Sequence, residues 1–208
     1  MKLTIFGATG KTGLLLCDLA VRAGHEVTAY VRNPAKLAPR AGDITVVEGS
    51  LEDEAAIRAA VEGRDAVISA LGTFDRKPNT VLSEGTRRIV EAMQAAHVAR
   101  LAAITSLGCG DSRAQVNNWI MRLVIKTIAK EIWADKDRQE NVIRASDLDY
   151  LVVRPGGLTD KPQRGTWTKL RSGESSKGKQ MIPRADVAAY IIKRLEKPVL
   201  GQDFVVLF

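Results

Sequence analysis

The stretch that decides the fold is LTIFGATGKTGLLLCDLA, residues 3–20, in which an apolar run passes through three glycines into a helical pattern. The run at 3–6 is typical of a buried strand, and residues 11–23, closed by Gly24, predict a helix. Gly7, Gly10 and Gly13 stand at the turn between them. In a nucleotide-binding βαβ unit such glycines permit a tight turn, backbone approach to a pyrophosphate and close helix–strand packing. The alternative is a turn needed only for folding.

The same alternation of strand and helix continues to the end of the chain. Further strands are predicted at 26–31, 44–47, 65–71, 100–106, 150–154 and 203–208, and further helices at 52–61, at 80–96 and, as a pair, within 116–146. Ser50 is the expected N-cap of the helix at 52–61. Unbroken apolar strands indicate a parallel sheet with helices on both faces. We therefore predict a single α/β domain over 1–208, a Rossmann-type doubly wound sheet, with a small substrate-side elaboration at about 156–184.

The composition is that of an ordinary globular protein, with 45% apolar and 26% charged residues in 208. No apolar run approaches the roughly 20 residues that span a bilayer. The chain begins with an apolar run that meets glycines too soon for a signal peptide. These features predict a cytoplasmic protein with no membrane partner.

Basic residues are concentrated near the end of the chain, which carries a net charge of +7. Seven basic residues and one acid, Glu174, lie between Lys161 and Arg184. A nucleic-acid binder usually pairs such a segment with a recognition motif or exposed aromatics, and this one holds only Trp167. The segment therefore predicts a positive rim for a small anionic ligand, with Trp167 as a stacking face and no nucleic acid as partner.

Metal ligation and disulfide bonding find little support. Cys17 and Cys109 lie far apart and form no Cys-x-x-Cys pair, and His25 and His97 each precede a predicted strand as turn residues. The expectation is no metal.

The residue after the second strand indicates which nucleotide the glycine loop would hold. An NAD site usually has an acid there to bind the ribose hydroxyls, whereas this strand ends in Arg32 with no acid close by. A guanidinium can bind a 2′-phosphate through paired hydrogen bonds. Lys11 and Lys36 could add positive charge, and the prediction is NADP(H). The alternative is a solvated arginine at a strand end.

Five stretches together resemble the atypical short-chain dehydrogenase/reductases, which bind NAD(P), and within that group the biliverdin-IXβ/flavin reductase-like proteins. These stretches are IFGATGKTG, VRNPAKL, VEGRDAVISALGT, VLSEGTRRIVEAM and VVRPGGLT. The resemblance implies a cofactor role for the residues that match the family's loops. They are Gly7, Thr9, Gly10, Lys11 and Thr12 at the pyrophosphate, Arg32 at the 2′-phosphate, Ser50 and Leu51 at the adenine, Ala70, Leu71 and Gly72 at the ribose, and Pro155 and Gly156 at the nicotinamide. The family usually has Asp at position 50, so Ser50 keeps a hydrogen-bonding group and loses the charge.

The tyrosines do not supply the acid of the commoner short-chain dehydrogenases, which use a Tyr-x-x-x-Lys pair. The residues four positions after Tyr30, Tyr150 and Tyr190 are a proline and two arginines. The usual alcohol-dehydrogenase and sugar-epimerase mechanisms are therefore poorly supported.

Ser106 matches the family's active-site serine, with Thr105 beside it at the cofactor. A serine is too weak an acid to work alone, and its alternative role is to cap the strand end or touch the nicotinamide. Lys136 matches the helix that carries substrate-side polar groups, and its alternative is solvated surface. These residues are the candidate catalytic pair.

The function expected from these features is hydride transfer from NADPH to a small, planar and anionic acceptor, such as a flavin, a quinone or a bilin. Such acceptors take hydride readily, so juxtaposition contributes most. The protein is expected to be a monomer or a small homo-oligomer. The alternative is a non-catalytic NADP(H)-binding redox sensor or an assembly or regulatory protein.

Overall fold

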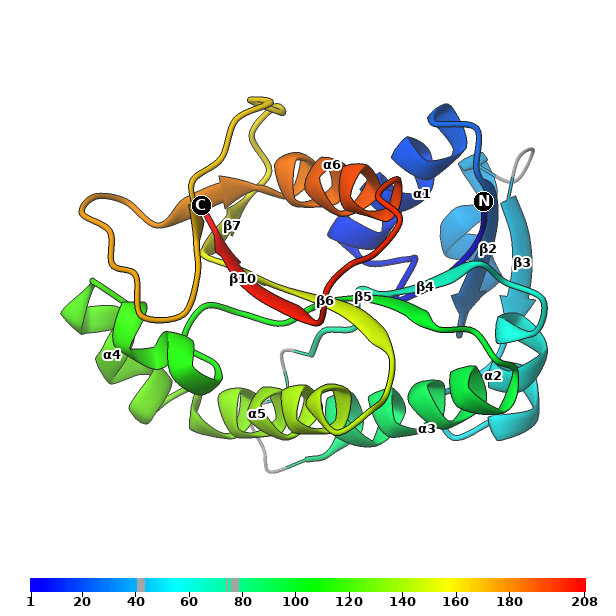
Figure 1. Cartoon of the computed structure of the whole chain (residues 1–208), viewed down its shortest axis with the longest axis horizontal. Helices are drawn as coiled ribbons and strands as arrows, with labels where there is room; N and C mark the ends of the chain where they lie inside the picture. The colour runs from blue at the N-terminus through cyan, green and yellow to red at the C-terminus, as the bar shows by residue number, and fades with distance from the viewer. Residues whose placement is uncertain (41–43, 74, 76–78) are drawn as a thin grey trace.

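The computed structural model of the chain describes residues 1–40, 44–73, 75 and 79–208, and its centre is an eight-stranded sheet (Figure 1). The strand order is β3-β2-β1-β4-β5-β6-β10-β8. Their bounds are β1 Lys2–Phe6, β2 Glu26–Val31, β3 Ile44–Glu48, β4 Ala66–Ser69, β5 Arg100–Ile104, β6 Asp149–Pro155, β8 Lys169–Leu170 and β10 Asp203–Leu207. Within the described chain, neighbouring strands of this sheet run parallel except β8, which is antiparallel to β10. The predicted Rossmann-type fold is confirmed.

Helices cover both faces of the sheet. Helices α1 (Lys11–Arg22) and α6 (Arg184–Leu195) lie on one face, and α2 (Glu54–Val61), α3 (Val81–Ala95) and α5 (Lys130–Arg144) lie on the other (Figure 1). Strand β1 shows why both cores are apolar. Leu3 and Ile5 are fully buried in one core and Phe6 in the other, because successive side chains of a strand point to opposite faces. None of the described helices combines the length and the apolarity needed to cross a bilayer.

The predicted cap of α2 is wrong by three residues. Asp53, not Ser50, is the N-cap, and its carboxylate accepts a hydrogen bond from the Ala56 amide at 2.9 Å. The Ser50 hydroxyl accepts from the amide of Glu52 at 3.2 Å. Both residue types cap helices, but the carboxylate of Asp53 stands directly before the first helical residue.

Helix α3 receives its cap from another helix. Its own N-cap residue, Thr80, makes no capping hydrogen bond with its side chain. Instead the fully buried carboxylate of Asp135, on α5, accepts from the Leu82 amide at 2.8 Å and from the Ser83 hydroxyl at 2.5 Å. This bond joins the two helices that cover the centre of the sheet.

The segment after β6 contains elements that the sequence pattern did not predict. They are β7 (Gly157–Thr159), which pairs in parallel with β9 (Met181–Pro183), the short β8 and the helix α6. The 3-10 helices Pro34–Arg40, after β2, and Gly110–Gln115, after β5, were not predicted either. The pair of helices predicted within 116–146 is confirmed as α4 (Trp119–Lys126) and α5. The fully buried Asp186 of α6 accepts from the amides of Arg164 and Gly165, at 3.0 and 2.9 Å. This carboxylate fixes the middle of the 156–184 segment against α6.

Candidate functional site

The glycine loop lies where β1 ends, beside the end of β4, at the point where the strand order reverses. Gly7 has φ +75°, and a Cβ there would come 2.5 Å from the carbonyl oxygen of Ala70. A Cβ on Gly13 would collide with the Gly7 carbonyl and come 2.8 Å from Cα of Ala8. Both positions therefore require glycine, which brings β1, β4 and α1 into close contact.

The amino end of α1 carries the features of an anion site. Its N-cap is Gly10, which has no side chain to bond the free amides, and its first turn contains no acid. Unpaired N–H groups and the helix dipole favour an anion at such an end. Thr9 and Thr12 flank Gly10 and are partly exposed. The pyrophosphate role predicted for this loop fits the geometry.

Two cations stand at this helix end and share one carboxylate. Lys11 Nζ lies 2.6 Å from Asp160, and Arg184, the first residue of α6, lies 2.5 Å from the other oxygen of Asp160. The hydrogen bond from Lys11, helped by the charge of Arg184, lowers the pKa of Asp160. Sequence reasoning missed Arg184 and Asp160 because α1 and the start of α6 meet only in the folded chain.

The end of β2 presents the residues predicted for the adenosine half of the cofactor. Arg32 and Lys36 are exposed, and Tyr30 donates a hydrogen bond of 2.7 Å to the backbone oxygen of Ser50. Ser50 and Arg32 both act on the side chain of Glu52. The hydrogen bond to Ser50 is the largest cause that lowers the pKa of Glu52, and the charges of Arg88 and Arg32 lower it to a smaller extent. Arg32, Lys36 and Ser50 therefore lie at one edge of the sheet.

The neighbouring predicted residues have different surroundings. Leu51 packs on α3, where a Cβ on Gly85 would come 2.7 Å from its Cδ1. Ala70 donates its amide to Phe6 at 2.9 Å, Leu71 packs against the core beneath α2 and α3, and Gly72 is exposed. Leu51 and Leu71 contribute packing, whereas Gly72 presents open backbone at the position predicted to border the ribose.

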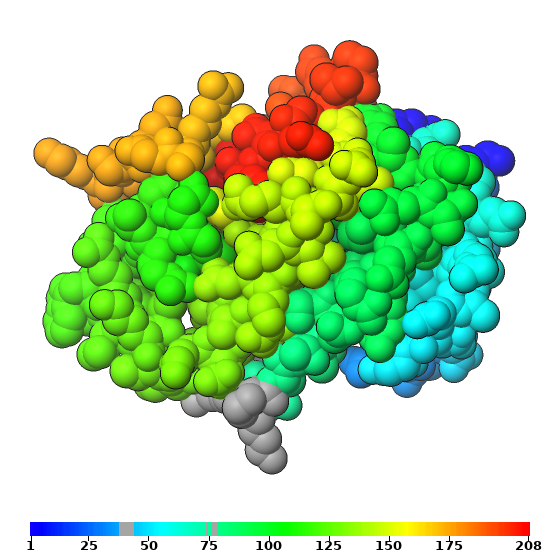
Figure 2. Space-filling model, turned by 60° about the horizontal axis from the view of Figure 1, so that its bottom comes forward, coloured from blue at the N-terminus to red at the C-terminus, as the bar shows by residue number. Residues whose placement is uncertain are grey.

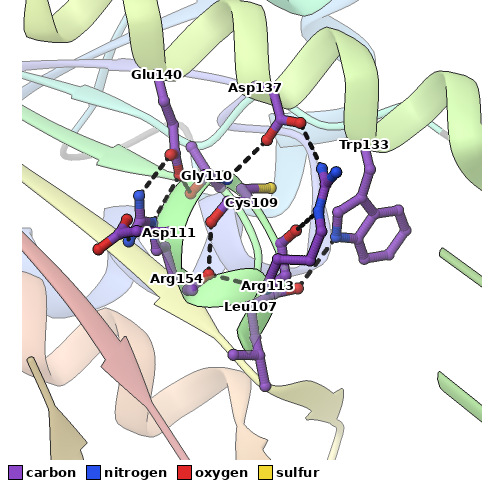
Figure 3. A network of polar contacts seen from close by, with 12 residues as sticks. Leu107, Cys109, Gly110, Asp111, Arg113, Trp133, Asp137, Glu140 and Arg154 are labelled. Atoms are coloured by element: carbon purple, nitrogen blue, oxygen red, sulfur yellow. Dashed lines mark hydrogen bonds and ion pairs between the residues drawn. The ribbon is translucent and has the colours of Figure 1, made fainter. Parts of the chain in front are cut away.

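A buried ion pair between Glu140 of α5 and Arg154 of β6 lies beside the end of β5 (Figure 3). Arg154 and Glu140, each 2% exposed in its side chain, form two hydrogen bonds, Nε–Oε1 at 2.9 Å and Nη2–Oε2 at 2.7 Å. The Thr105 hydroxyl donates to Glu140 at 2.7 Å, and Arg154 Nη1 donates to Asp111 at 2.7 Å. Thr105 thus uses its hydroxyl inside the protein, and a contact with the cofactor would come from its other atoms.

Helix α5 also holds the loop that follows Ser106 (Figure 3). Asp137 accepts from the Gly110 amide at 2.8 Å and from Arg113 at 2.6 Å, and Trp133 Nε1 donates to the Leu107 carbonyl at 3.1 Å. Ser106 itself is half-buried, and its hydroxyl has no hydrogen-bond partner among the described residues. A fixed loop with a free hydroxyl is suited to contact a ligand.

Lys136 is buried, so the alternative interpretation of it as a solvated surface residue is wrong. Lys136 is 9% exposed, and its Nζ donates to the carbonyl of Thr105 at 3.3 Å. Burial lowers the pKa of Lys136 although the negative charges of Glu140 and Asp135 oppose this shift. The residue four positions before it is Ile132, which occupies the place of the tyrosine in a Tyr-x-x-x-Lys pair.

Cys109 lies in the same loop and is fully buried. Burial is the largest cause that raises the pKa of its thiol to about 12. The thiol is therefore neutral at physiological pH and is no activated nucleophile.

Pro155 and Gly156 complete this end of the site. The Pro155 carbonyl accepts from the Leu107 amide at 2.9 Å, which joins the end of β6 to the loop after Ser106. A Cβ on Gly156 would collide with the carbonyl of Gln180. The structure thus brings Ser106, Lys136 and Gly156 to the same end of the sheet.

Trp167, the predicted stacking face, is partly exposed and uses part of its ring inside the protein. Its ring meets Tyr190 edge-on, with 5.5 Å between centroids, and it packs against the core beneath α1 and α6. These contacts hold the 156–184 segment to α6, and stacking of a ligand on Trp167 stays a prediction.

Comparison with known proteins agrees with this geometry. The model of a family described as NAD(P)H-binding matches residues 7–198. A protein of Bacillus subtilis described as the uncharacterized sugar epimerase YhfK is 31% identical over 208 residues, covering 95% of this chain and 89% of that protein. The Aspergillus parasiticus oxidoreductase aflX is 24% identical over 205 residues, covering 91% and 75%.

Two solved structures share the fold over nearly the whole chain. ChuY of Escherichia coli O157:H7, described as an anaerobillin reductase, has 26% identity and a TM-score of 0.84, with 100% of this chain and 97% of that one covered. A Veillonella parvula short-chain dehydrogenase/reductase in complex with NADP has 18% identity and a TM-score of 0.81, with 99% and 93% covered. The expected resemblance is confirmed, and the chain belongs to the NAD(P)H-binding family whose model it matches.

Proposed function

We propose that this protein is an NADPH-dependent reductase that transfers hydride to a small, planar and conjugated acceptor such as a flavin, quinone or bilin. The observation that carries the proposal is Lys136, buried at the end of β5 with Ile132 where a tyrosine acid would stand. Reduction of an ordinary carbonyl needs an acid to protonate the developing alkoxide. An electron-poor conjugated acceptor delocalises the negative charge that hydride transfer creates, so it does not need such an acid.

The residues fit the cofactor that the family implies. The cradle at Gly7 and Gly13 would be filled by any Cβ, and the uncapped α1 offers amides to a diphosphate. Lys11 and Arg184 add positive charge there, and Arg32 would bind the 2′-phosphate. When bound, the nicotinamide supplies the hydride.

The chain's own groups then position the acceptor. The Ser106 hydroxyl would hydrogen-bond a carbonyl or ring nitrogen of the acceptor, while Pro155 and Gly156 border the nicotinamide position. The ordered loop 106–115 holds these groups in place. Good juxtaposition of two reactants contributes up to about 7–11 kcal/mol, and the proton comes from solvent.

The activity is tested by NADPH oxidation with flavins, quinones and bilins, beside Ser106→Ala. We expect turnover with at least one class and a lower kcat in the variant. Absence of turnover above background with every acceptor would remove the reductase proposal. Tight NADPH binding without turnover would favour the alternative, a cofactor-binding sensor or regulatory protein, for which the missing tyrosine is the supporting observation.

Cofactor choice is tested by Arg32→Asp. Two charged hydrogen bonds at about 1.5 kcal/mol each correspond to roughly a hundredfold loss of NADPH affinity. NADH affinity should change little, because it lacks the 2′-phosphate. The matched control is Arg22→Asp, the same charge change on the exposed carboxyl end of α1. Equal NADPH affinity in wild type and Arg32→Asp, measured by calorimetry, would contradict the assignment.

A further inference from the structure

A hollow of about 490 Å³ lies between the start of α4 and the segment 176–178. It is lined by Asn117, Asn118, Trp119, Ile120, Ser176, Lys177 and Gly178. Helix α4 and the segment before β9 lie together at one end of the molecule (left in Figure 1), and the surface view shows the segment against α4 (Figure 2). Lys177 belongs to the basic segment that the sequence predicts as a positive rim, whereas the residues of α4 and the turn before it were assigned no role.

The walls of the hollow combine an aromatic face with a free cation. Trp119 is 72% exposed and Ile120 is 53% exposed, although both are large apolar residues. Lys177 is exposed and makes no ion pair within the described part of the chain. The acid of this segment, Glu174, accepts from the backbone amide of Arg171 at 2.8 Å. The hollow is therefore suited to a ligand that is both flat and anionic.

The amino end of α4 does not provide the anion site. Asn118 caps this helix, and its side-chain oxygen accepts from the amides of Ile120 and Met121 at 2.9 and 3.2 Å. These donors are already used. Attraction for an anion thus comes from the side chain of Lys177.

Gln180 connects the hollow to the nicotinamide end of the site. Its side chain accepts from the Asn117 amide at 3.1 Å and donates to the Gln115 carbonyl at 2.8 Å. Its backbone carbonyl accepts from the Gly157 amide at 2.8 Å and is the atom that a Cβ on Gly156 would strike. Gln180 thus contacts both Asn117, which lines the hollow, and the turn at Gly156.

We propose that this hollow binds the part of the acceptor that lies away from the hydride, and this inference rests on the proposed function. Trp119 packs against a flat or apolar portion of the acceptor, and Lys177 binds its phosphate or carboxylate. The substrate class is thereby narrowed to conjugated acceptors that carry an anionic side arm. The reacting end of the ring would then lie toward Gly156, and its far end would lie against Trp119.

Riboflavin and its phosphate, FMN, provide a matched pair of probes. Lys177→Glu should raise the KM for FMN by about tenfold, as loss of a charged contact does, and should leave the KM for riboflavin within about twofold. Trp119→Ala should raise both KM values, since both probes share the ring. The control is Lys193→Glu, an exposed residue of α6 away from the hollow, and NADPH affinity should be unchanged in all three. Biliverdin and its dimethyl ester make the same comparison for a carboxylate.

A binding titration separates this inference from the proposed function. Flavin fluorescence is followed as wild type and variants, saturated with NADP⁺, are added to FMN or riboflavin. Weaker FMN binding in Lys177→Glu, without turnover in any assay, would support the hollow and defeat the reductase proposal. An unchanged preference for FMN over riboflavin in Lys177→Glu, in binding and in KM, would overturn the inference even if turnover is found.

Discussion

The substitution Glu140→Gln tests the buried ion pair most directly. It removes the negative charge that pairs with Arg154 and leaves that guanidinium, 2% exposed, with only Asp111, whose side chain is 42% exposed. Breaking a buried pair on one side costs about 3–5 kcal/mol, because one charge stays buried and uncompensated. Since Asp111 and the Gln amide retain part of the pairing, we expect a loss near the lower limit, about 3 kcal/mol.

The measurement is urea unfolding at pH 7 followed by circular dichroism, with a thermal scan. For a chain of this size about 3 kcal/mol corresponds to a fall in Tm of roughly 6–12 °C. The control is Glu91→Gln, which removes an exposed i,i+4 partner of Arg87 and should cost less than about 1 kcal/mol.

A double variant, Glu140→Met with Arg154→Met, should recover most of the stability lost in Glu140→Gln. Replacing both charges by apolar side chains is often neutral, since neither is then buried alone. The reasoning is refuted if the free energy of unfolding of Glu140→Gln lies within about 1 kcal/mol of that of wild type. It is also refuted if the double variant is no more stable than Glu140→Gln.

Two further predictions concern Lys136 and Gly13. Because burial lowers the pKa of Lys136, the folded protein binds this proton more weakly than the unfolded chain, so wild-type stability should rise with pH up to the ordinary lysine value. The free energy of unfolding of Lys136→Met should lack that rise, so the variant should be most stabilised relative to wild type at neutral pH. If urea unfolding gives the same difference between variant and wild type at pH 7 and at pH 10, the pKa of Lys136 is not lowered. Gly13→Ala should weaken NADPH binding at least about tenfold and lower Tm, because its Cβ would meet the Gly7 carbonyl; calorimetry showing wild-type affinity would refute the close packing.

The sheet and most of its helices could be predicted because their residues carry a local pattern. Apolar runs such as 26–31 and 203–208 are long enough to specify a buried strand without knowledge of their partners. The strands β7, β8 and β9 have two or three residues each and exist through pairing with distant segments, so they leave no such pattern. The sequence places the cap of α2 at Ser50 instead of Asp53 because both side chains can accept the hydrogen bond that caps a helix.

The cofactor loop could be predicted because its glycines are close in sequence, whereas the substrate end depends on contacts across the fold. The stretch DKDRQE, residues 135–140, is entirely polar and is typical of a solvated helix face. Asp135, Lys136 and Glu140 are buried because α3, the Thr105 carbonyl and Arg154 provide their partners. Likewise the sequence does not show that Trp167 packs against Tyr190 while Trp119 is exposed on α4.

The carboxylate of Asp135 at the start of α3 also constrains the order of events during synthesis. The ribosome completes α3 before it begins α5, so a nascent chain that ends between these helices still has the amides of Leu82 and Ser83 without their native partner. Those amides find their native partner only after α5 has emerged and docked. A fragment that stops before α5 therefore lacks a completed third helix, even though it contains every glycine of the first loop.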